Sequence, residues 1–156
     1  MAEPITLAFL GCGRITKRHA DTLRRFGPAV RCRFASRDPA RAAEFNRLLK
    51  GTGSYGDYQS AIADDTVDAI VIATPPDSHL ELALAGLAAG RHVVIEKPAF
   101  LRSADADAVR DAAARANRQA LVAENYHYRP LLTAVQRLIA DGAIGTLRLV
   151  QLDAVK

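Results

Sequence analysis

The stretch ITLAFLGCGRIT, residues 5–16, decides the fold of this 156-residue chain. Its first six residues form a short apolar run, which is typical of a buried parallel strand. Gly11 permits a tight turn after that strand, and Gly13 lets the backbone approach a pyrophosphate. The helical pattern that follows offers free N–H groups and a positive dipole to such an anion. We therefore expect a dinucleotide to contact residues of this loop, namely Gly11, Cys12, Gly13, Arg14 and Ile15.

One residue of this loop departs from the usual pattern. Thr16 stands where a glycine or alanine normally follows, which weakens the match. The alternative interpretation is a glycine turn in an unrelated α/β protein. The position of the loop, directly after a predicted strand and before a predicted helix, favours the dinucleotide site.

Apolar runs and helical patterns alternate along most of the chain. Strands are predicted over 5–10, 30–35, 68–73, 92–95 and 119–123, and helices over 77–89 and 103–117. Ser103 is the expected N-cap of the second helix. This alternation predicts an α/β fold, a Rossmann-type doubly wound parallel sheet in three layers.

The pattern changes near the C-terminal end of the sequence. A polar-aromatic turn over 125–130 leads into a helix that begins at Pro130 and ends at Gly142, and the alternating residues 146–155 predict a final strand. We expect a dinucleotide-binding domain over 1–124, a linker and helix over 125–145, and the start of a truncated substrate domain over 146–156. A strand without a partner could also pair with a second copy of the chain.

The amino-acid composition limits the classes of protein to which this chain can belong. Hydrophobic residues make up 49% and charged residues 24%, as in ordinary globular proteins. The two cysteines have no metal-ligand spacing, so we expect no metal site, and no apolar run is long enough to cross a membrane. We expect a cytoplasmic protein without a membrane partner.

Charge is unevenly distributed. Residues 1–50 hold 11 Lys and Arg against 4 Asp and Glu, a net charge of +7, and the remainder has a net charge of −3. A positive N-terminal region suits an anionic ligand, although a solvated basic helix face would look the same. No basic tail, aromatic cluster or recognition motif accompanies it, so we do not expect nucleic acid as a partner.

The end of the second predicted strand bears on the type of dinucleotide. NAD sites usually place an acidic residue there, whereas NADP sites offer an arginine to the 2′-phosphate. Ser36 and Arg37 occupy this turn, and Asp38 follows at a position suited to capping the helix that starts near Pro39. The sequence favours NADP over NAD, and an exposed Arg37 beside bound NAD is the alternative.

Two further strand ends carry polar residues. TPPDSH, residues 74–79, follows one strand, and we expect Thr74, Pro75 and His79 to line the cofactor cleft, although a lone histidine is more often a packing residue. Glu96 and Lys97 follow the next strand. A lysine beside a carboxylate at the rim of a sheet is a candidate acid–base group, and a surface ion pair is the alternative.

The motifs together resemble one known family, the Gfo/Idh/MocA oxidoreductases, which use NAD or NADP and in many cases act on sugars and polyols. The matching pieces occur in family order: GCGRI at 11–15, SRDPARA at 36–42, TPPDSH at 74–79, EKP at 96–98 and AENYHYRP at 123–130.

This resemblance implies roles for particular residues. It makes Lys97 a catalytic residue near the nicotinamide and the substrate, and the segment from Asn125 to Arg129 leads out of the cleft towards the second domain. We also expect Glu96, Lys97 and Asn125 to contact the cofactor. The resemblance also implies a cis peptide bond between Lys97 and Pro98. Family enzymes add a C-terminal α/β domain that supplies most of the substrate pocket, and this sequence ends as that domain would begin.

The function that follows is hydride transfer between a nicotinamide dinucleotide and a small hydroxylated substrate, with a sugar or polyol as the expected class. A dinucleotide-binding or redox-sensing module without turnover is the alternative.

Overall fold

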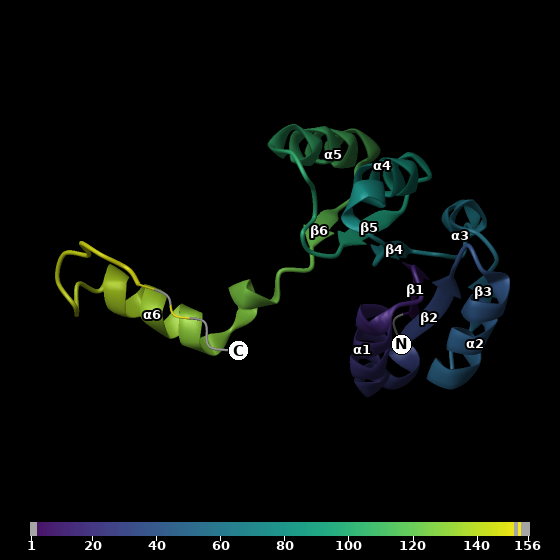
Figure 1. Ribbon diagram of the computed structural model, residues 1–156, viewed down its shortest axis with the longest axis horizontal. Coiled ribbons are helices and arrows are strands. Elements are labelled where there is room, and N and C mark those ends of the chain that lie inside the picture. The colour runs from purple at the N-terminus through teal and green to yellow at the C-terminus, as the bar shows by residue number, and fades with distance from the viewer. Residues whose placement is uncertain (1–2, 152, 154–156) are drawn as a thin grey trace. The chain divides into compact units, whose positions relative to one another are not determined.

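The computed structural model describes residues 3–151 and 153, and it divides into two units (Figure 1). The first unit is Met1–Ala123 and the second is Glu124–Lys156. The division lies one residue before the domain boundary expected from the sequence. In the first unit the expected sheet forms; the second contains a short helical segment.

The first unit contains a six-stranded parallel sheet whose strand order is β3-β2-β1-β4-β5-β6. The strands are β1 (Ile5–Leu10), β2 (Val30–Ala35), β3 (Gly53–Tyr55), β4 (Ala69–Ile72), β5 (His92–Ile95) and β6 (Ala120–Val122). The chain moves outward from β1 to β3, returns to the other side of β1 for β4, and moves outward again. This reversal between β1 and β4 is the topological switch of a Rossmann-type fold, which confirms the predicted fold class.

Helices cover both faces of the sheet because successive strand residues point in opposite directions. Phe9 and Phe34 pack on one face among residues of α1 (Arg14–Leu23) and α2 (Pro39–Leu49). Leu10 and Ile72 pack on the other face, among residues of three further helices. These are α3 (Tyr58–Ala63), α4 (His79–Ala88) and α5 (Ser103–Ala116). The three expected layers are therefore present.

The sequence predicted one of two helix N-caps correctly. The Asp38 carboxylate accepts hydrogen bonds from the backbone N–H groups of Ala40 and Arg41, as predicted for the cap of α2. The N-cap of α5 is Arg102, so the prediction of Ser103 was wrong by one position. The Arg102 guanidinium lies 2.7 Å from Asp105 in the first turn, and this pair anchors the start of the helix.

The sequence analysis missed β3 and α3, which a half-buried polar cluster connects to the sheet. The Arg33 guanidinium donates to Tyr55 at 2.9 Å, to Asp64 at 2.7 Å and to Thr66 at 2.8 Å. Tyr55 also donates to Asp64 at 2.7 Å. Hydrogen bonds from Thr66 and Tyr55, with the charge of Arg33, lower the pKa of Asp64 from 3.8 to about 2.

We expect Asp64→Asn to lower the free energy of unfolding at pH 7 by about 1 to 2 kcal/mol. The lowered pKa means that Asp64 stabilises the fold above its unfolded-state pKa, and that this contribution disappears as the pH falls through about 2. Denaturant unfolding between pH 7 and pH 2 measures the effect. The difference in free energy of unfolding between Asp64→Asn and the unsubstituted protein should disappear near pH 2. The control variant Asp65→Asn, which changes an exposed neighbouring residue, should show no such difference at any pH. A difference for Asp64→Asn that stays constant with pH would rule out this electrostatic contribution.

The second unit contains the 3-10 helix η3 (Asn125–Tyr128) and the helix α6 (Pro130–Ala140). Pro130 occupies the first turn of α6, as predicted, and no residue of the helix is buried. The predicted strand over 146–155 was wrong for 146–151 and 153, which form no strand; the rest of it lies outside the described residues. Alternation alone does not make a strand, because its backbone groups need a neighbouring strand for pairing. Pairing with a second copy through this segment is still an untested expectation.

None of the helices in the described part of the chain has the length and apolar character that a membrane span requires.

A candidate dinucleotide site at the sheet switch

The glycine loop lies where the order of the strands reverses, at the carboxyl ends of β1 and β4. The Gly11 N–H donates to the Ala35 carbonyl at 3.0 Å, and Gly11 adopts a φ of +102°. A Cβ at this residue would lie 2.7 Å from the Ala73 carbonyl oxygen, so only glycine fits between the two strand ends. Gly13, in contrast, would place a Cβ in open space. The loop therefore presents an uncovered stretch of backbone at Gly13.

Two side chains hold the loop in this shape. Thr16 is fully buried, and its hydroxyl donates to the Gly11 carbonyl at 2.6 Å. This bond explains why a threonine is compatible with the loop at the position where the sequence pattern calls for glycine or alanine. Arg41 of α2 donates from Nε to the Cys12 carbonyl at 2.7 Å. Both bonds occupy carbonyl groups, so they leave the N–H groups of the loop and of the first helical turn for an anion.

Cys12 contributes backbone to the loop and has no reactive thiol. Its side chain is 6% exposed, and the sulfur lies 3.6 Å from the Ala35 carbonyl. Burial raises the pKa of Cys12 to about 11, although the charge of Arg41 opposes the shift. The thiol is therefore protonated at neutral pH, and Cys12 is not a nucleophile.

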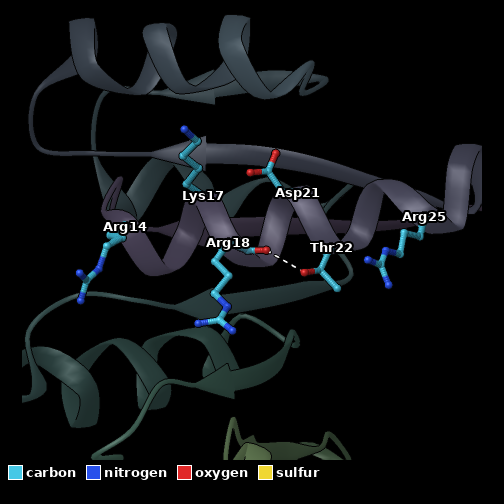
Figure 2. Close-up of a pocket in the computed structure, with 6 residues that line it drawn as sticks. All are labelled: Arg14, Lys17, Arg18, Asp21, Thr22 and Arg25. Carbon is cyan, nitrogen blue, oxygen red and sulfur yellow. Dashed lines mark hydrogen bonds between the residues drawn. The ribbon is translucent and has the colours of Figure 1, made fainter. Parts of the chain in front are cut away.

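The helix α1 extends the positive charge of the loop along its surface. Arg14, Arg18 and Arg25 project to one side of the helix, while Lys17 and Asp21 project to the other (Figure 2). These residues and Thr22 line a shallow hollow of about 370 Å³. Arg14 thus lies beside the loop with its side chain exposed, and its contact with a cofactor stays a prediction. Ile15, the next residue, is half-buried in the first turn.

A second hollow brings two predicted motifs together. Arg37, from the end of β2, lines a cavity of about 300 Å³ with Thr74 and Pro75, which follow β4. Ser36 is 7% exposed, and its hydroxyl accepts a hydrogen bond from the Asp38 N–H at 3.1 Å. Ser36 therefore shapes the turn that directs Arg37 outward. The cavity is also lined by Tyr58, Gln59, Asp77, Ser78, Glu81 and Leu82.

His79 lies beneath this region and contacts protein on both sides. It is 1% exposed, with Nδ1 at 3.0 Å from the Ala99 carbonyl and Nε2 at 2.9 Å from the Thr74 carbonyl. A neutral imidazole donates to one of these oxygens, and a protonated ring donates to both. The geometry favours the packing role that the sequence left open, because His79 joins the loop after β4 to the loop after β5.

Glu96 and Lys97 follow β5 at the same edge of the sheet. Glu96 is 7% exposed, and its carboxylate accepts from His19 of α1 at 2.5 Å and from the Lys97 N–H at 3.0 Å. The Lys97 side chain is exposed, and within the described residues its ammonium contacts no acidic group. The surface ion pair that was the alternative to a functional lysine is therefore absent from the described residues. The peptide bond between Lys97 and Pro98 is cis, as the resemblance implies.

One expected cofactor residue belongs to the other unit of the chain. Asn125 begins η3 and belongs to the second unit, so its role in the cofactor cleft stays a prediction. Sequence reasoning missed His19 and Arg41. His19 belongs to none of the motifs, whereas Arg41 lies within the motif at 36–42 but was not predicted to contact the loop. Both side chains reach the site from a helix. It also missed Tyr58 and Gln59, although Asp57 before them is a helix-capping residue that could have revealed α3.

Comparison with known proteins agrees with this geometry. The family model for oxidoreductases with an NAD-binding Rossmann fold, GFO_IDH_MocA, matches residues 5–124. Levoglucosan dehydrogenase of Pseudarthrobacter phenanthrenivorans is 35% identical over 118 residues, which are 76% of this chain and 30% of that enzyme. D-xylose 1-dehydrogenase (NADP(+)) of Hypocrea jecorina is 32% identical over 133 residues, which cover 83% of this chain and 33% of the enzyme.

A solved structure resembles the chain over nearly the same region. Levoglucosan dehydrogenase in complex with NADH and levoglucosan has a TM-score of 0.81 and 29% identity, covering 91% of this chain and 40% of that one. The chain spans less than half the length of the relatives named here. The range matched by the family model, residues 5–124, nonetheless includes the glycine loop, both strand-end motifs and Lys97. The chain belongs to the Gfo/Idh/MocA family of oxidoreductases with an NAD-binding Rossmann fold.

Proposed function

We propose that this chain is the nucleotide-binding part of an NAD(P)-dependent dehydrogenase that moves hydride between a nicotinamide and a sugar-like or other small hydroxylated substrate. The observation that carries the proposal is the edge of the sheet at which the open Gly13 backbone and the exposed Lys97 both lie. The relatives support the substrate class, because their names include levoglucosan and D-xylose dehydrogenases.

The loop residues fit a dinucleotide. Open space at Gly13 leaves room for a pyrophosphate against the backbone, and the first turn of α1 has no side-chain cap to compete for its N–H groups. Arg14 adds a positive charge at the same helix end. In this proposal, Gly11 to Ile15 bind the pyrophosphate, while Thr74 and Pro75 bound the cleft on the β4 side.

The residues at the end of β5 suit proton transfer. When bound, the nicotinamide supplies or accepts the hydride. Lys97 then moves or stabilises the proton of the substrate hydroxyl, because its exposed ammonium is free to reach a substrate above the sheet edge. Glu96 lies beneath it and does not extend into the open space.

We propose NADP as the preferred cofactor, with NAD as the alternative. Support comes from Arg37, whose exposed guanidinium has no carboxylate partner in the described part of the chain and lines a cavity with Thr74 and Pro75. Asp38, the nearest acidic residue, is engaged as the cap of α2. The relatives support both cofactors: the D-xylose dehydrogenase is named for NADP(+), and a levoglucosan dehydrogenase was solved with NADH.

We expect Arg37→Ala to weaken binding of NADPH by about ten- to a hundred-fold and to leave binding of NADH nearly unchanged. The reason is that a charge-assisted bond to the 2′-phosphate contributes about 1.5 to 3 kcal/mol, and NADH has no such phosphate. Fluorescence titration with both nucleotides measures the difference. Arg47→Ala, which removes an exposed arginine from the last turn of α2, is the matched control. Equal losses for the two nucleotides would remove the case for NADP.

The proposed function is tested by nucleotide titration followed by a panel of sugars and polyols. We expect NADPH or NADH to bind and at least one sugar or polyol to be oxidised. Binding without turnover on any member would favour the alternative, a dinucleotide-binding module. A protein that binds neither nucleotide would contradict the assignment of the loop.

A cytoplasmic location is part of the proposal. Both cysteines are free thiols, Cys12 buried and Cys32 half-buried, which suits a reducing compartment.

A further inference from the structure

Glu96 is the residue at which two parts of the site meet. Its backbone N–H donates to the Ile72 carbonyl at 2.9 Å, which fixes it at the edge of the sheet beside β4. Its carboxylate is almost completely buried, and each oxygen has a separate donor. Oε1 accepts from His19 Nε2 at 2.5 Å, and Oε2 accepts from the Lys97 N–H at 3.0 Å.

His19 is fixed in turn by the helix and by the core beneath it. It lies in the second turn of α1, the helix that starts at the glycine loop. Its ring stacks on Phe9 with the ring centres 6.5 Å apart and the planes 25° apart. Phe9 is fully buried in β1, so the ring of His19 has a rigid surface on one face. The histidine side chain itself is 36% exposed, because the rest of it faces solvent.

These contacts form a continuous path through the site. The glycine loop leads into α1, α1 carries His19, His19 holds Glu96, and Glu96 holds the backbone of Lys97. The strands β1 and β5 are not neighbours, because β4 lies between them. The His19–Glu96 bond therefore connects two strand ends that the sheet does not join directly.

Lys97 has little else to hold it. Within the described residues its ammonium forms no hydrogen bond or ion pair, and its side chain is exposed. The bond from its N–H to Glu96 is the contact that fixes the start of its side chain. Since the effect of a catalytic group depends steeply on its position, a carboxylate that fixes the backbone also sets the reach of the ammonium.

We propose that His19 is a positioning residue, which acts through Glu96 to hold Lys97 in register with the nucleotide-binding loop. Glu96 is then part of this link, with each of its carboxylate oxygens bound to a donor within the chain. The inference rests on the proposed function for the role of Lys97. The link itself, from His19 through Glu96 to the Lys97 N–H, consists of contacts within this chain. His19 touches neither the substrate nor the cofactor in this assignment.

The link can be tested without any ligand. We expect His19→Leu to release Glu96 and to speed hydrogen exchange at the Lys97 amide by about ten-fold or more, as for the loss of one charge-assisted hydrogen bond. Two-dimensional ¹H–¹⁵N NMR of the whole chain measures this amide. His19→Gln keeps an N–H donor on a side chain of similar reach and should restore slow exchange. His92→Leu removes an exposed histidine, with its own hydrogen bond, from the opposite end of β5 and should leave the Lys97 amide unaffected.

Turnover gives a second readout that a purely structural role would not produce. In His19→Leu we expect kcat to fall by about ten-fold or more with the Kd of the nucleotide nearly unchanged, because the position of Lys97 has altered. The melting temperature should fall by no more than about a few degrees, from the loss of one hydrogen bond to a buried carboxylate. His19→Gln should recover most of kcat. Loss of stability and of nucleotide affinity in the same proportion as kcat would contradict a positioning role.

The failure of the link and the failure of the proposed function give different results. Wild-type exchange at Lys97 in His19→Leu would overturn the link, as would an equal acceleration in His92→Leu. A wild-type protein that binds neither NADH nor NADPH would overturn the proposed function, and the exchange measurement would still decide whether His19 holds Lys97.

Discussion

Gly13→Leu is expected to raise the Kd for NADH and NADPH by more than about a hundred-fold, a loss of at least about 2.7 kcal/mol of binding free energy. The leucine would occupy the open space that we assign to the pyrophosphate and would cover the N–H groups around it. The fold should tolerate the change, because Gly13 has a φ of −114° and a Cβ there would have no heavy atom within 4 Å. Fluorescence titration gives the affinity and thermal melting gives the stability.

A second glycine of the loop provides the contrast. Gly11→Ala should destabilise the fold, since it forces a side chain into a φ of +102° and places a Cβ 2.7 Å from the Ala73 carbonyl. The two variants therefore separate ligand binding from folding within three residues. If Gly13→Leu retained its affinity for both nucleotides, the loop would not be the pyrophosphate site.

Lys97→Met is expected to lower kcat by about 10²- to 10⁴-fold, the range for loss of a general acid–base group. Methionine keeps the length and apolar stem of lysine but cannot hold a proton. The backbone bond from residue 97 to Glu96 does not involve the side chain, so nucleotide affinity and melting temperature should change little. Steady-state kinetics on the best sugar or polyol of the panel measures the effect.

Two further variants sharpen this prediction. Lys50→Met removes an exposed lysine at the end of α2 and should leave kcat unchanged. Lys97→Arg keeps the positive charge but holds its proton too tightly for transfer, so it should restore little activity. Full activity in Lys97→Met would exclude Lys97 as the acid–base group, and recovery in Lys97→Arg would indicate that charge alone is needed.

The sequence predicted strands inside the sheet, because their residues are mainly apolar. The runs at 5–10, 30–35 and 92–95 are strands with the same limits in the structure. The strand β3 was missed because its three residues, Gly53–Tyr55, contain no apolar run, whereas the equally short edge strand β6 has the apolar sequence ALV. The pairing of β3 with β2 is a tertiary contact that local pattern does not reveal.

The sequence predicted those parts of the candidate site that depend on backbone conformation. Glycines, strand ends and the turn at Arg37 follow from local rules, and the hollow that unites Arg37 with Thr74 and Pro75 follows from the parallel sheet. The His19–Glu96 contact spans 77 positions in the sequence. It depends on the angle at which α1 crosses the sheet, and no local pattern encodes that angle.

The central place of β1 has a consequence for how the protein assembles during synthesis. β1 pairs with β2 on one side and, in register from Leu7 to Leu10, with β4 on the other. A growing chain can complete the first pairing while β4 is still being made, so the backbone N–H and C=O groups on one edge of β1 stay unpaired until residue 72 has left the ribosome. In this interval the nascent chain exposes an unpaired strand, and it is then that we expect it to depend most on chaperones.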